Sequence, residues 1–165
     1  MGNFLGGRIT DTIGSRGGRH KGIDIATPIG SEVNAPPGNW TVEQAGVHGG
    51  YGKKVTLRNA TTGGSVIYGH LDDILVKMGQ QVVSGELVGF SGNTGKSTGP
   101  HVHLEAHNEA GDIVNPLSLY GSAAKGSIFS NMKAFEKPLK GLTLSMARLA
   151  MTINNGAKDL RKVIG

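Results

Sequence analysis

The sequence has no cysteine, few aromatic residues and no long apolar run. Without cysteine, the 165-residue chain has neither a disulfide framework nor a thiolate metal site. Aromatic residues make up 5% of the chain and charged residues 18%, so we expect an aliphatic core. No transmembrane span is visible. The opening residues, MGNFLGGRIT, lack the basic region and the apolar run of a secretory signal.

Glycine is abundant instead, and the 28 glycines follow no collagen-like period. This content indicates many tight turns, as in a compact all-β fold. Short apolar or alternating runs, separated by Gly and Asn clusters, predict an antiparallel two-sheet sandwich or barrel. The runs are residues 40–46, 53–59, 65–71, 81–90 (two short strands around Ser84-Gly85) and 101–107. We expect this domain to span residues 17–121, after an N-terminal arm of residues 1–16.

The last quarter of the chain differs in charge and in pattern. Up to Gly121 the net charge is −1, whereas from Ser122 onward eight Lys/Arg stand against two Asp/Glu, a net charge of +6. An apolar stripe with helical spacing consists of Leu142, Met146, Leu149, Ala150 and Ile153. Residues 122–165 are therefore predicted to form a basic amphipathic helical tail. It packs on its own domain or on a partner subunit, which we favour, or lies on a membrane. Few aromatic residues are present for stacking, which disfavours nucleic acid.

The segment GPHVHLEAH, residues 99–107, holds three of the six histidines at alternate positions. Two residues along a strand advance about 6.6 Å and return to the same face. His101 and His103 can therefore reach one small site, while Val102 and Leu104 supply the core face. A metal site, a catalytic pair and an ordinary strand with a polar outer face all fit this pattern alone.

The segment RHKGIDIATPIG supplies partners, because His20 and Asp24 lie four residues apart. On an ideal strand that separation is about 13 Å, too far for one ion. A helix would put both residues on one face, but Gly22 and the β-branched residues after it disfavour a helix. A bend at Gly22 would bring the imidazole and the carboxylate together. With one more histidine and an open position, this donor set is that of a catalytic zinc centre.

Other polar residues near these motifs have two interpretations each. His70, in VIYGHLDD, is either a site residue or a satisfied core or turn histidine. Glu105 either orients a histidine or is a surface carboxylate. Tyr68 either lines the site or is a buried structural tyrosine. His48 and His107 are expected at the surface.

A known family shares several of these motifs, in order and at similar spacing. The chain resembles the lysostaphin/LytM-type zinc endopeptidases of peptidoglycan in the segments RHKGIDIATPIG, GGYGKKVTL, YGHL, VGFSGNTGKSTGPHVHLE and NPLSLY. The resemblance covers about residues 17–121 and implies the duplicated hybrid motif type of all-β fold. It also implies a Zn²⁺ cofactor. The implied metal ligands are His20, Asp24 and His103, and the implied catalytic residues are His70 and His101.

The activity implied by the resemblance is hydrolysis of peptide bonds in the cross-links or stem peptides of bacterial peptidoglycan. Zinc would polarise the scissile carbonyl. His101 would act as general base, and His70 as its partner or as a donor to the oxyanion. The alternative is a catalytically silent wall-binding or regulatory module of the same fold. A lipoyl-type carrier domain is disfavoured, because the hairpin tip Ser84-Gly85 offers no lysine.

The place of action implied by this activity is the cell wall, outside the cell. Because the chain shows no signal peptide, we expect one of two forms of delivery. The chain is a fragment of a longer secreted protein, or it is a phage virion component whose tail docks on other virion subunits.

Overall fold

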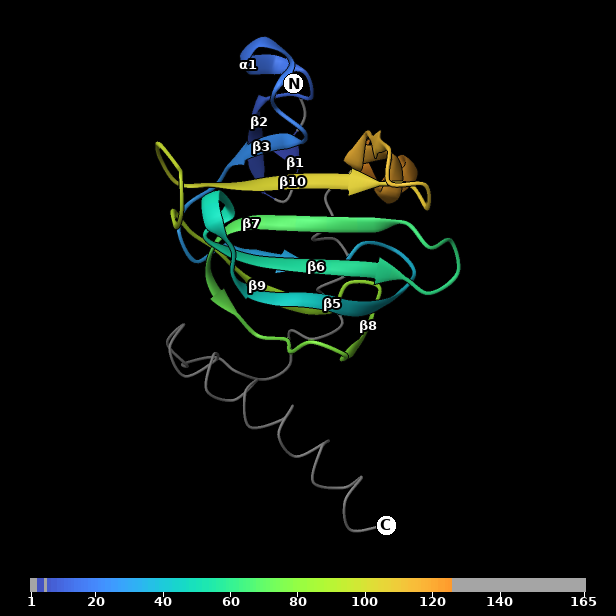
Figure 1. Ribbon diagram of the computed structural model, residues 1–165. Helices are drawn as coiled ribbons and strands as arrows, with labels where there is room; N and C mark the ends of the chain where they lie inside the picture. Colours follow the sequence, from blue (N-terminus) through green and yellow to red (C-terminus); the bar gives the residue numbers. More distant parts are fainter. Residues whose placement is uncertain (1–2, 5, 126–165) are drawn as a thin grey trace. The chain divides into compact units, whose positions relative to one another are not determined.

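The described part of the chain is built mainly from strands. The computed structural model describes residues 3–4 and 6–125 (Figure 1). The strands, in chain order, are β1 (Asn3–Phe4), β2 (Gly7–Asp11), β3 (Ile23–Ala26), β4 (Glu32–Asn34), β5 (Asn39–Val47), β6 (Lys53–Asn59), β7 (Ser65–Ile74), β8 (Gln81–Val83), β9 (Leu87–Ser91), β10 (His101–His107) and β11 (Ile113–Val114).

Alternating apolar side chains direct one face of each long strand into the core. β10 buries Val102, Leu104 and Ala106, the face predicted to lie opposite its histidines. β6 buries Val55 and Leu57 completely. The buried hydrophobic residues of the described chain are aliphatic apart from Trp40, Tyr68, Phe90 and Tyr120. Since each buried aliphatic side chain contributes roughly 1.5–3 kcal/mol, this interior is the main source of stability.

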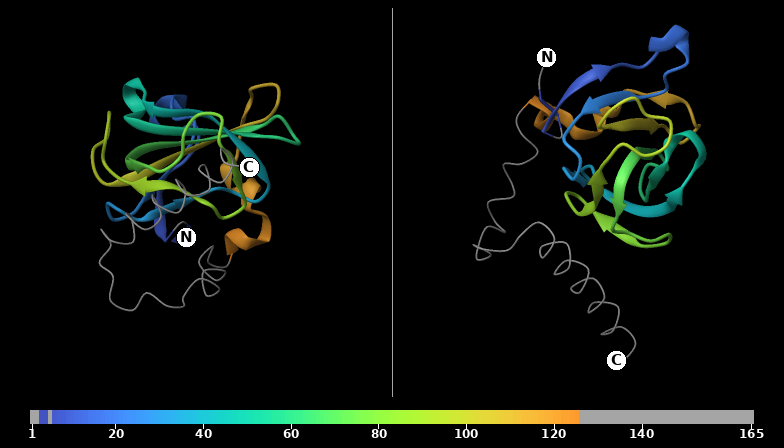
Figure 2. Two further views of the ribbon diagram at one scale, coloured as in Figure 1. Left: turned by 90° about the horizontal axis from the view of Figure 1, so that it is seen from below. Right: turned by 90° about the vertical axis from the view of Figure 1, so that its left-hand side faces the viewer.

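The strands pair antiparallel in one network that curls around the core. Their order is β1-β2-β3-β10-β7-β6-β5-β8, with β11 paired to β10 and β4 paired to β9. β7 pairs with β10 up to Gly69 and with β9 from Leu71 onward, so it links the β4–β9 pair to the rest of the network. The curvature is visible from the side and from below (Figure 2). The predicted antiparallel sandwich or barrel is thus confirmed.

The five predicted strand regions are all present, as β5, β6, β7, the β8–β9 pair and β10. Within the predicted N-terminal arm, β2 joins the sheet by pairing with β3, with Ile9 opposite Ile25. The apolar stripe of the predicted helical tail lies within residues 126–165, outside the described residues.

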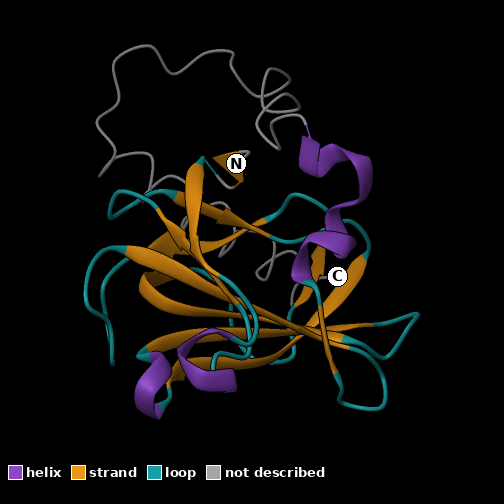
Figure 3. Cartoon of the chain, turned by 90° about the horizontal axis from the view of Figure 1, so that it is seen from above, coloured by secondary structure: helices purple, strands orange, loops and turns teal. Residues whose placement is uncertain are grey.

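The helical pieces are short turns at the margins of the strands (Figure 3). They are α1 (Ser15–Gly18) and the 3₁₀ segments η1 (Gly49–Tyr51) and η2 (Pro116–Lys125). Among the described residues, no helix has both the length and the apolar character needed to cross a membrane.

Two glycine-rich loops, one before β6 and one before β10, lie directly against each other. The main-chain N–H of Lys96 donates a 2.8 Å hydrogen bond to the carbonyl oxygen of Gly50. Gly52 and Gly95 have φ angles of 65° and 73°. A Cβ on Gly95 would lie 2.3 Å from the main-chain nitrogen of Gly52, so only glycine fits this contact. The loops therefore form one packed unit beside the end of β10.

Candidate metal centre and neighbouring histidines

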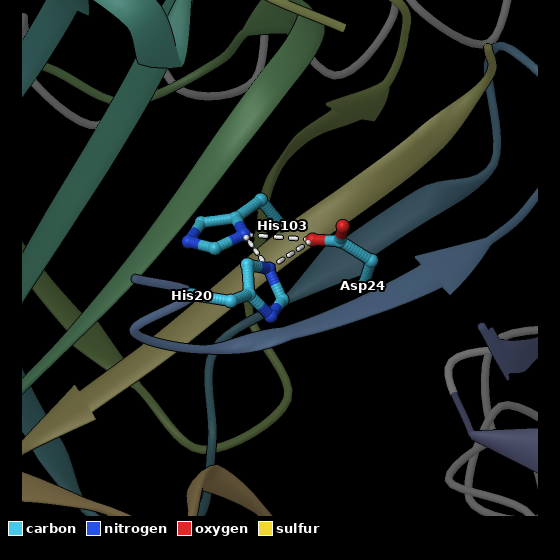
Figure 4. Close-up of side chains that lie close together, drawn as sticks. All are labelled: His20, Asp24 and His103. Atoms are coloured by element: carbon cyan, nitrogen blue, oxygen red, sulfur yellow. Dashed lines mark hydrogen bonds and ion pairs between the residues drawn. The ribbon is translucent and has the colours of Figure 1, made fainter. Parts of the chain in front are cut away.

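Three buried polar side chains converge where β3 lies beside β10 (Figure 4). Asp24 and His103 are direct partners in the register of these strands, and Nδ1 of His103 lies 2.7 Å from Oδ1 of Asp24. Nε2 of His20 lies 3.0 Å from the same oxygen and 3.2 Å from Nδ1 of His103. One potential ligand atom from each residue lies within 4.8 Å of the others.

His20 reaches this cluster because the chain bends at Gly22, as the sequence predicted. A Cβ on Gly22 would come within 2.3 Å of the carbonyl oxygen of Leu104 and 2.9 Å of Cγ of Glu105. Only glycine lets the segment lie this close to β10. The bend folds back a separation that would be about 13 Å on a straight strand, so the imidazole meets the carboxylate of Asp24.

Hydrogen bonds on the outer side of both rings fix where a neutral ring keeps its proton. Nδ1 of His20 donates to the carbonyl oxygen of Thr12 at 2.9 Å, which leaves the lone pair on Nε2. Nε2 of His103 donates to Oε1 of Glu105 at 2.8 Å, which leaves the lone pair on Nδ1. Two imidazole nitrogens and a carboxylate oxygen thus face one point. This donor set fits a divalent cation of the zinc type, with a coordination position left open.

The charges of the cluster stabilise one another. Burial would raise the pKa of Asp24, but the hydrogen bond and the positive charge of His103 hold it well below its ordinary value. Burial would lower the pKa of His103, but hydrogen bonds to Asp24 and Glu105 raise it to about 9. A cation bound here would take the place of a proton, because a metal ligand must be deprotonated.

His70 and His101 lie beside this cluster, with their ring centroids 4.6 Å apart. Main-chain carbonyl oxygens again hold the outer nitrogens: Nδ1 of His70 donates to Thr94 at 2.7 Å, and Nδ1 of His101 donates to Gly99 at 2.7 Å. Nε2 of His101 lies 3.7 Å from Oδ1 of Asp24. In their neutral forms both rings therefore carry a lone pair on Nε2 and can accept a proton there.

The backbone of His70 is strained, with a φ of 61°. Such a conformation is uncommon for a residue other than glycine and is concentrated at functional sites. Burial lowers the pKa of His70, which favours the neutral ring at neutral pH. A strained backbone and a neutral, oriented imidazole favour the interpretation of His70 as a site residue over that of a core histidine.

A cavity of about 280 Å³ opens beside the cluster. Its lining includes Asp24, Arg16, Thr98 and His101. Nη2 of Arg16 donates to Oδ2 of Asp24, and its Nε donates to Asp11 at 2.8 Å. The cavity therefore borders the carboxylate of Asp24, which Arg16 contacts, and the ring of His101.

The structure brings together all five residues that the sequence singled out: His20, Asp24, His70, His101 and His103. Tyr68 belongs to the core instead, because its hydroxyl bonds to the carbonyl oxygen of Asn34 at 3.0 Å and to the hydroxyl of Tyr120 at 2.9 Å. It is the buried structural tyrosine that the sequence offered as one interpretation.

A group of side chains lies behind His103, and of the two interpretations of Glu105 its contact with His103 fits the one in which it orients a histidine; the contacts with Tyr51 and His107 were not predicted from the sequence. Glu105 is only 3% exposed and contacts His103, Tyr51 and His107, so the surface interpretation is wrong. Burial would raise the pKa of Glu105, but hydrogen bonds from these three residues hold it at about 2. The alternation of residues 103, 105 and 107 along one face was an available signal. Tyr51 comes from η1, in the loop before β6, and no local sequence pattern predicted its contact with Glu105.

Comparison with known proteins adds three kinds of match. A family model described as peptidase family M23 matches residues 18–116. The peptidoglycan DD-endopeptidase ShyA of Vibrio cholerae is 43% identical over 86 residues, which is 52% of this chain and 20% of that protein.

Two similar solved structures are a zinc-containing peptidase from Vibrio cholerae and the catalytic domain of lysostaphin from Staphylococcus simulans. The first has 33% identity and a TM-score of 0.59, over 67% of this chain and 36% of that one. The second has 30% identity and a TM-score of 0.57, over 68% of this chain and 86% of that one. The chain spans between about a fifth and two fifths of the length of the curated relatives it matches, 20% of ShyA and 41% of the glycyl-glycine endopeptidase ALE-1 of Staphylococcus capitis.

Proposed function

The chain belongs to peptidase family M23, and we propose that it is a zinc-dependent endopeptidase that hydrolyses peptide bonds in the cross-links or stem peptides of bacterial peptidoglycan. The observation that carries the proposal is the convergence of His20, Asp24 and His103 next to two further oriented histidines. The similarity of the chain to a peptidoglycan DD-endopeptidase supports the substrate class, and its similarity to a zinc-containing peptidase supports the metal.

His20, Asp24 and His103 would hold the ion. Zinc is the metal we propose because its catalytic sites use three nitrogen and oxygen ligands from the protein and leave one position open. When bound, zinc polarises a substrate carbonyl and lowers the pKa of a water molecule.

We assign the role of general base to His101. Its Nε2 lies 3.7 Å from Oδ1 of Asp24, and its ring lines the cavity that a substrate would enter. The bond from Nδ1 to Gly99 keeps Nε2 as the acceptor for the proton. The same ring then donates that proton to the leaving amine, since an imidazole both accepts and donates near neutral pH.

His70 is the partner of His101 in this assignment. Its ring lies beside that of His101, and its Nδ1 is committed to Thr94, so only Nε2 remains for the reaction. A hydrogen bond from Nε2 of His70 to the developing oxyanion requires the imidazolium form, in which Nε2 has taken up a proton from water; the neutral form, which burial favours by lowering the pKa, accepts a hydrogen bond there instead. Oriented donors of this kind stabilise the transition state because they need no reorganisation during the reaction.

The surroundings of the site suit an extended peptide with small side chains. The loops before β6 and β10 contain three glycines each, and a cavity whose lining includes Arg16 and Thr98 opens beside the cluster. A thin peptide needs such a low-bulk wall. We propose that the protein acts at the cell wall. Delivery as part of a longer secreted protein or on a phage virion stays a prediction. The apolar stripe of the predicted tail, which would dock on virion subunits, lies outside the described residues.

The alternative hypothesis is a silent binding or regulatory module of the same fold. Such a module would not need a complete set of ligands and proton-transfer groups. All five side chains are present and converge, with each outer ring nitrogen hydrogen-bonded. This completeness favours the enzyme.

The deciding experiment is digestion of purified cell walls by the zinc-loaded protein, with identification of the newly formed amino termini by mass spectrometry. Walls with direct and with glycine cross-links should be compared. We expect new amino termini from at least one wall type, their loss on addition of a chelator, and their return with excess Zn²⁺. Bound zinc with no new termini from any wall would overturn the proposal in favour of the binding module.

A further inference from the structure

We propose that Glu105 is a positioning residue, which holds His103 in the tautomer and orientation that direct Nδ1 at the metal, and that Tyr51 and His107 hold Glu105 in turn. The inference rests on the proposed metal site, and it adds to that site an outer group of three residues that holds one of its ligands in place.

The carboxylate of Glu105 is bonded on both oxygens. Oε1 accepts from Nε2 of His103 at 2.8 Å and from the hydroxyl of Tyr51 at 2.7 Å. Oε2 accepts from Nε2 of His107 at 3.1 Å. With the side chain only 3% exposed, solvent does not compete for these positions. The carboxylate cannot rotate without breaking one of the bonds.

His103 differs in this respect from the other three histidines of the site. The outer nitrogens of those rings donate to main-chain carbonyl oxygens, of Thr12 for His20, Thr94 for His70 and Gly99 for His101. The backbone fixes the position of a main-chain carbonyl oxygen, and this oxygen can only accept a hydrogen bond. The outer nitrogen of His103 instead meets a side chain, so its tautomer depends on the chemistry of one residue. Metal-binding histidines commonly have such an outer partner, and its loss weakens metal binding.

Tyr51 closes the group from the loop before β6. Its ring lies 5.7 Å from that of His103, between centroids, and its hydroxyl points at Oε1. The ring fits because residue 69 is glycine: a Cβ there would lie 3.1 Å from Cδ1 of Tyr51. Tyr51 therefore packs against the ligand ring and also bonds to the group that orients it.

The substitution Glu105→Gln tests whether Glu105 only stabilises the fold, as part of a buried ion pair, or also sets the tautomer of His103. The glutamine keeps the shape but offers one acceptor oxygen and one NH₂ group in place of two acceptor oxygens. At least one of the three donors then faces another donor. If the NH₂ group faces His103, the ring must carry its proton on Nδ1 and loses the lone pair for the metal.

The test compares E105Q with wild type by competition for Zn²⁺ against a chromogenic chelator. We expect the dissociation constant for zinc to rise about 10- to 100-fold. The matched control is Glu109→Gln, which makes the same chemical change at an exposed position and should bind zinc like wild type. Tyr51→Phe removes one donor to Oε1 and should raise the constant less than E105Q does.

A second readout follows the proton on His103 directly. In the zinc-loaded wild-type protein, Nε2–H bonded to a carboxylate should give a downfield imidazole resonance by NMR. This resonance should move upfield or vanish in E105Q, should shift in Y51F and should stay in E109Q.

Zinc affinity within twofold of wild type in a folded E105Q protein, or an unchanged resonance in Y51F, overturns the inference. If E105Q does not fold, Y51F decides alone. Failure of the proposed function is distinguishable, because then the wild-type protein itself would not bind zinc in the same assay.

Discussion

The carbonyl oxygen of Thr94 accepts a 2.7 Å hydrogen bond from Nδ1 of His70 and ties this ring to a glycine-rich loop. The loop is itself anchored, because Oγ1 of Thr94 donates to the carbonyl oxygen of Leu71 at 2.8 Å and accepts from the main-chain N–H of Lys53 at 2.9 Å. These hydrogen bonds hold the backbone of His70 in its strained conformation, with φ at 61°. The position of His70 thus depends on how closely the loops pack.

We expect Gly95→Ala to loosen this arrangement. Residue 95 has a φ of 73°, and its Cβ would lie 2.3 Å from the nitrogen of Gly52. The left-handed backbone and the clash together should lower the free energy of unfolding by about 2–4 kcal/mol. Displacement of Thr94 should also lower kcat, by about 100-fold if His70 shifts by an ångström. Denaturant unfolding and wall-cleavage rates measure the two effects.

The control for this variant is Gly79→Ala, which has a φ of 82° but no atom within 4 Å of the added Cβ. It measures the backbone term alone, about 1–2 kcal/mol, and should leave cleavage unchanged. Equal losses of stability in the two variants would show that the contact between Gly52 and Gly95 is not tight.

His101→Ala and His103→Ala should separate proton transfer from metal binding. The first removes the proposed base and leaves the three ligand atoms intact, so zinc content should stay at the wild-type level while cleavage falls by at least about 100-fold. The second removes a ligand, so zinc and cleavage should both be lost. Elemental analysis of the purified variants, beside cleavage assays, makes the distinction.

His48→Ala serves as the control for both substitutions. His48 lies in the loop before β6, and its main-chain N–H bonds to Gly52, which alanine preserves. Zinc content and cleavage should be unaffected. Loss of zinc in H101A would show that the ligand assignment is wrong, and retention of zinc in H103A would show the same.

Gly22→Ala should damage the metal centre through the backbone. The added Cβ would lie 2.3 Å from the carbonyl oxygen of Leu104, so the bend must move away from β10 and carry His20 with it. We expect a loss of about 1–3 kcal/mol in stability and weaker zinc binding. Gly50→Ala is the matched control, because its nearest atom is 3.9 Å away, in ordinary contact. Equal stability of the two variants would contradict the close approach at Gly22.

Local pattern was enough to predict the longer strands and the bend. The alternation in residues 101–107 and 53–59 is strong because each strand buries one apolar face. β4 and β11 escaped prediction, since strands of three and two residues carry no readable period. β2 lies in the predicted arm and owes its place to pairing with β3.

The same limit applies to the site. Each motif contained its own histidine or aspartate, and the separation of His20 from Asp24 required a bend that Gly22 could supply. The structure brings these residues together, while their roles stay predictions. The group around Glu105 needed a tyrosine from a loop 54 positions away, which only tertiary packing places there. Whether a polar residue on a strand meets solvent or a partner depends on such packing, and alternation alone cannot decide it.

The three tyrosines should stay un-ionised for as long as the protein is folded. Burial raises the pKa of Tyr68 and of Tyr120 above the ordinary value of 10, and burial with the neighbouring Glu105 does the same for Tyr51. An unfolded chain loses these protons near pH 10, as model peptides do. Above that pH the unfolded state binds fewer protons than the folded state, so stability must fall as pH rises.

The measurement is the ultraviolet absorbance of tyrosinate during alkaline titration, followed together with circular dichroism. We expect tyrosinate to appear only with the loss of folded structure, in one cooperative step. Tyr68→Phe removes one of the three groups that drive this step, so its free energy of unfolding should fall less steeply with pH above 10. A gradual titration centred near pH 10 in protein that remains folded would mean that solvent reaches these hydroxyls. The hydrogen-bonded pair of Tyr68 and Tyr120 would then not be the closed core contact described above.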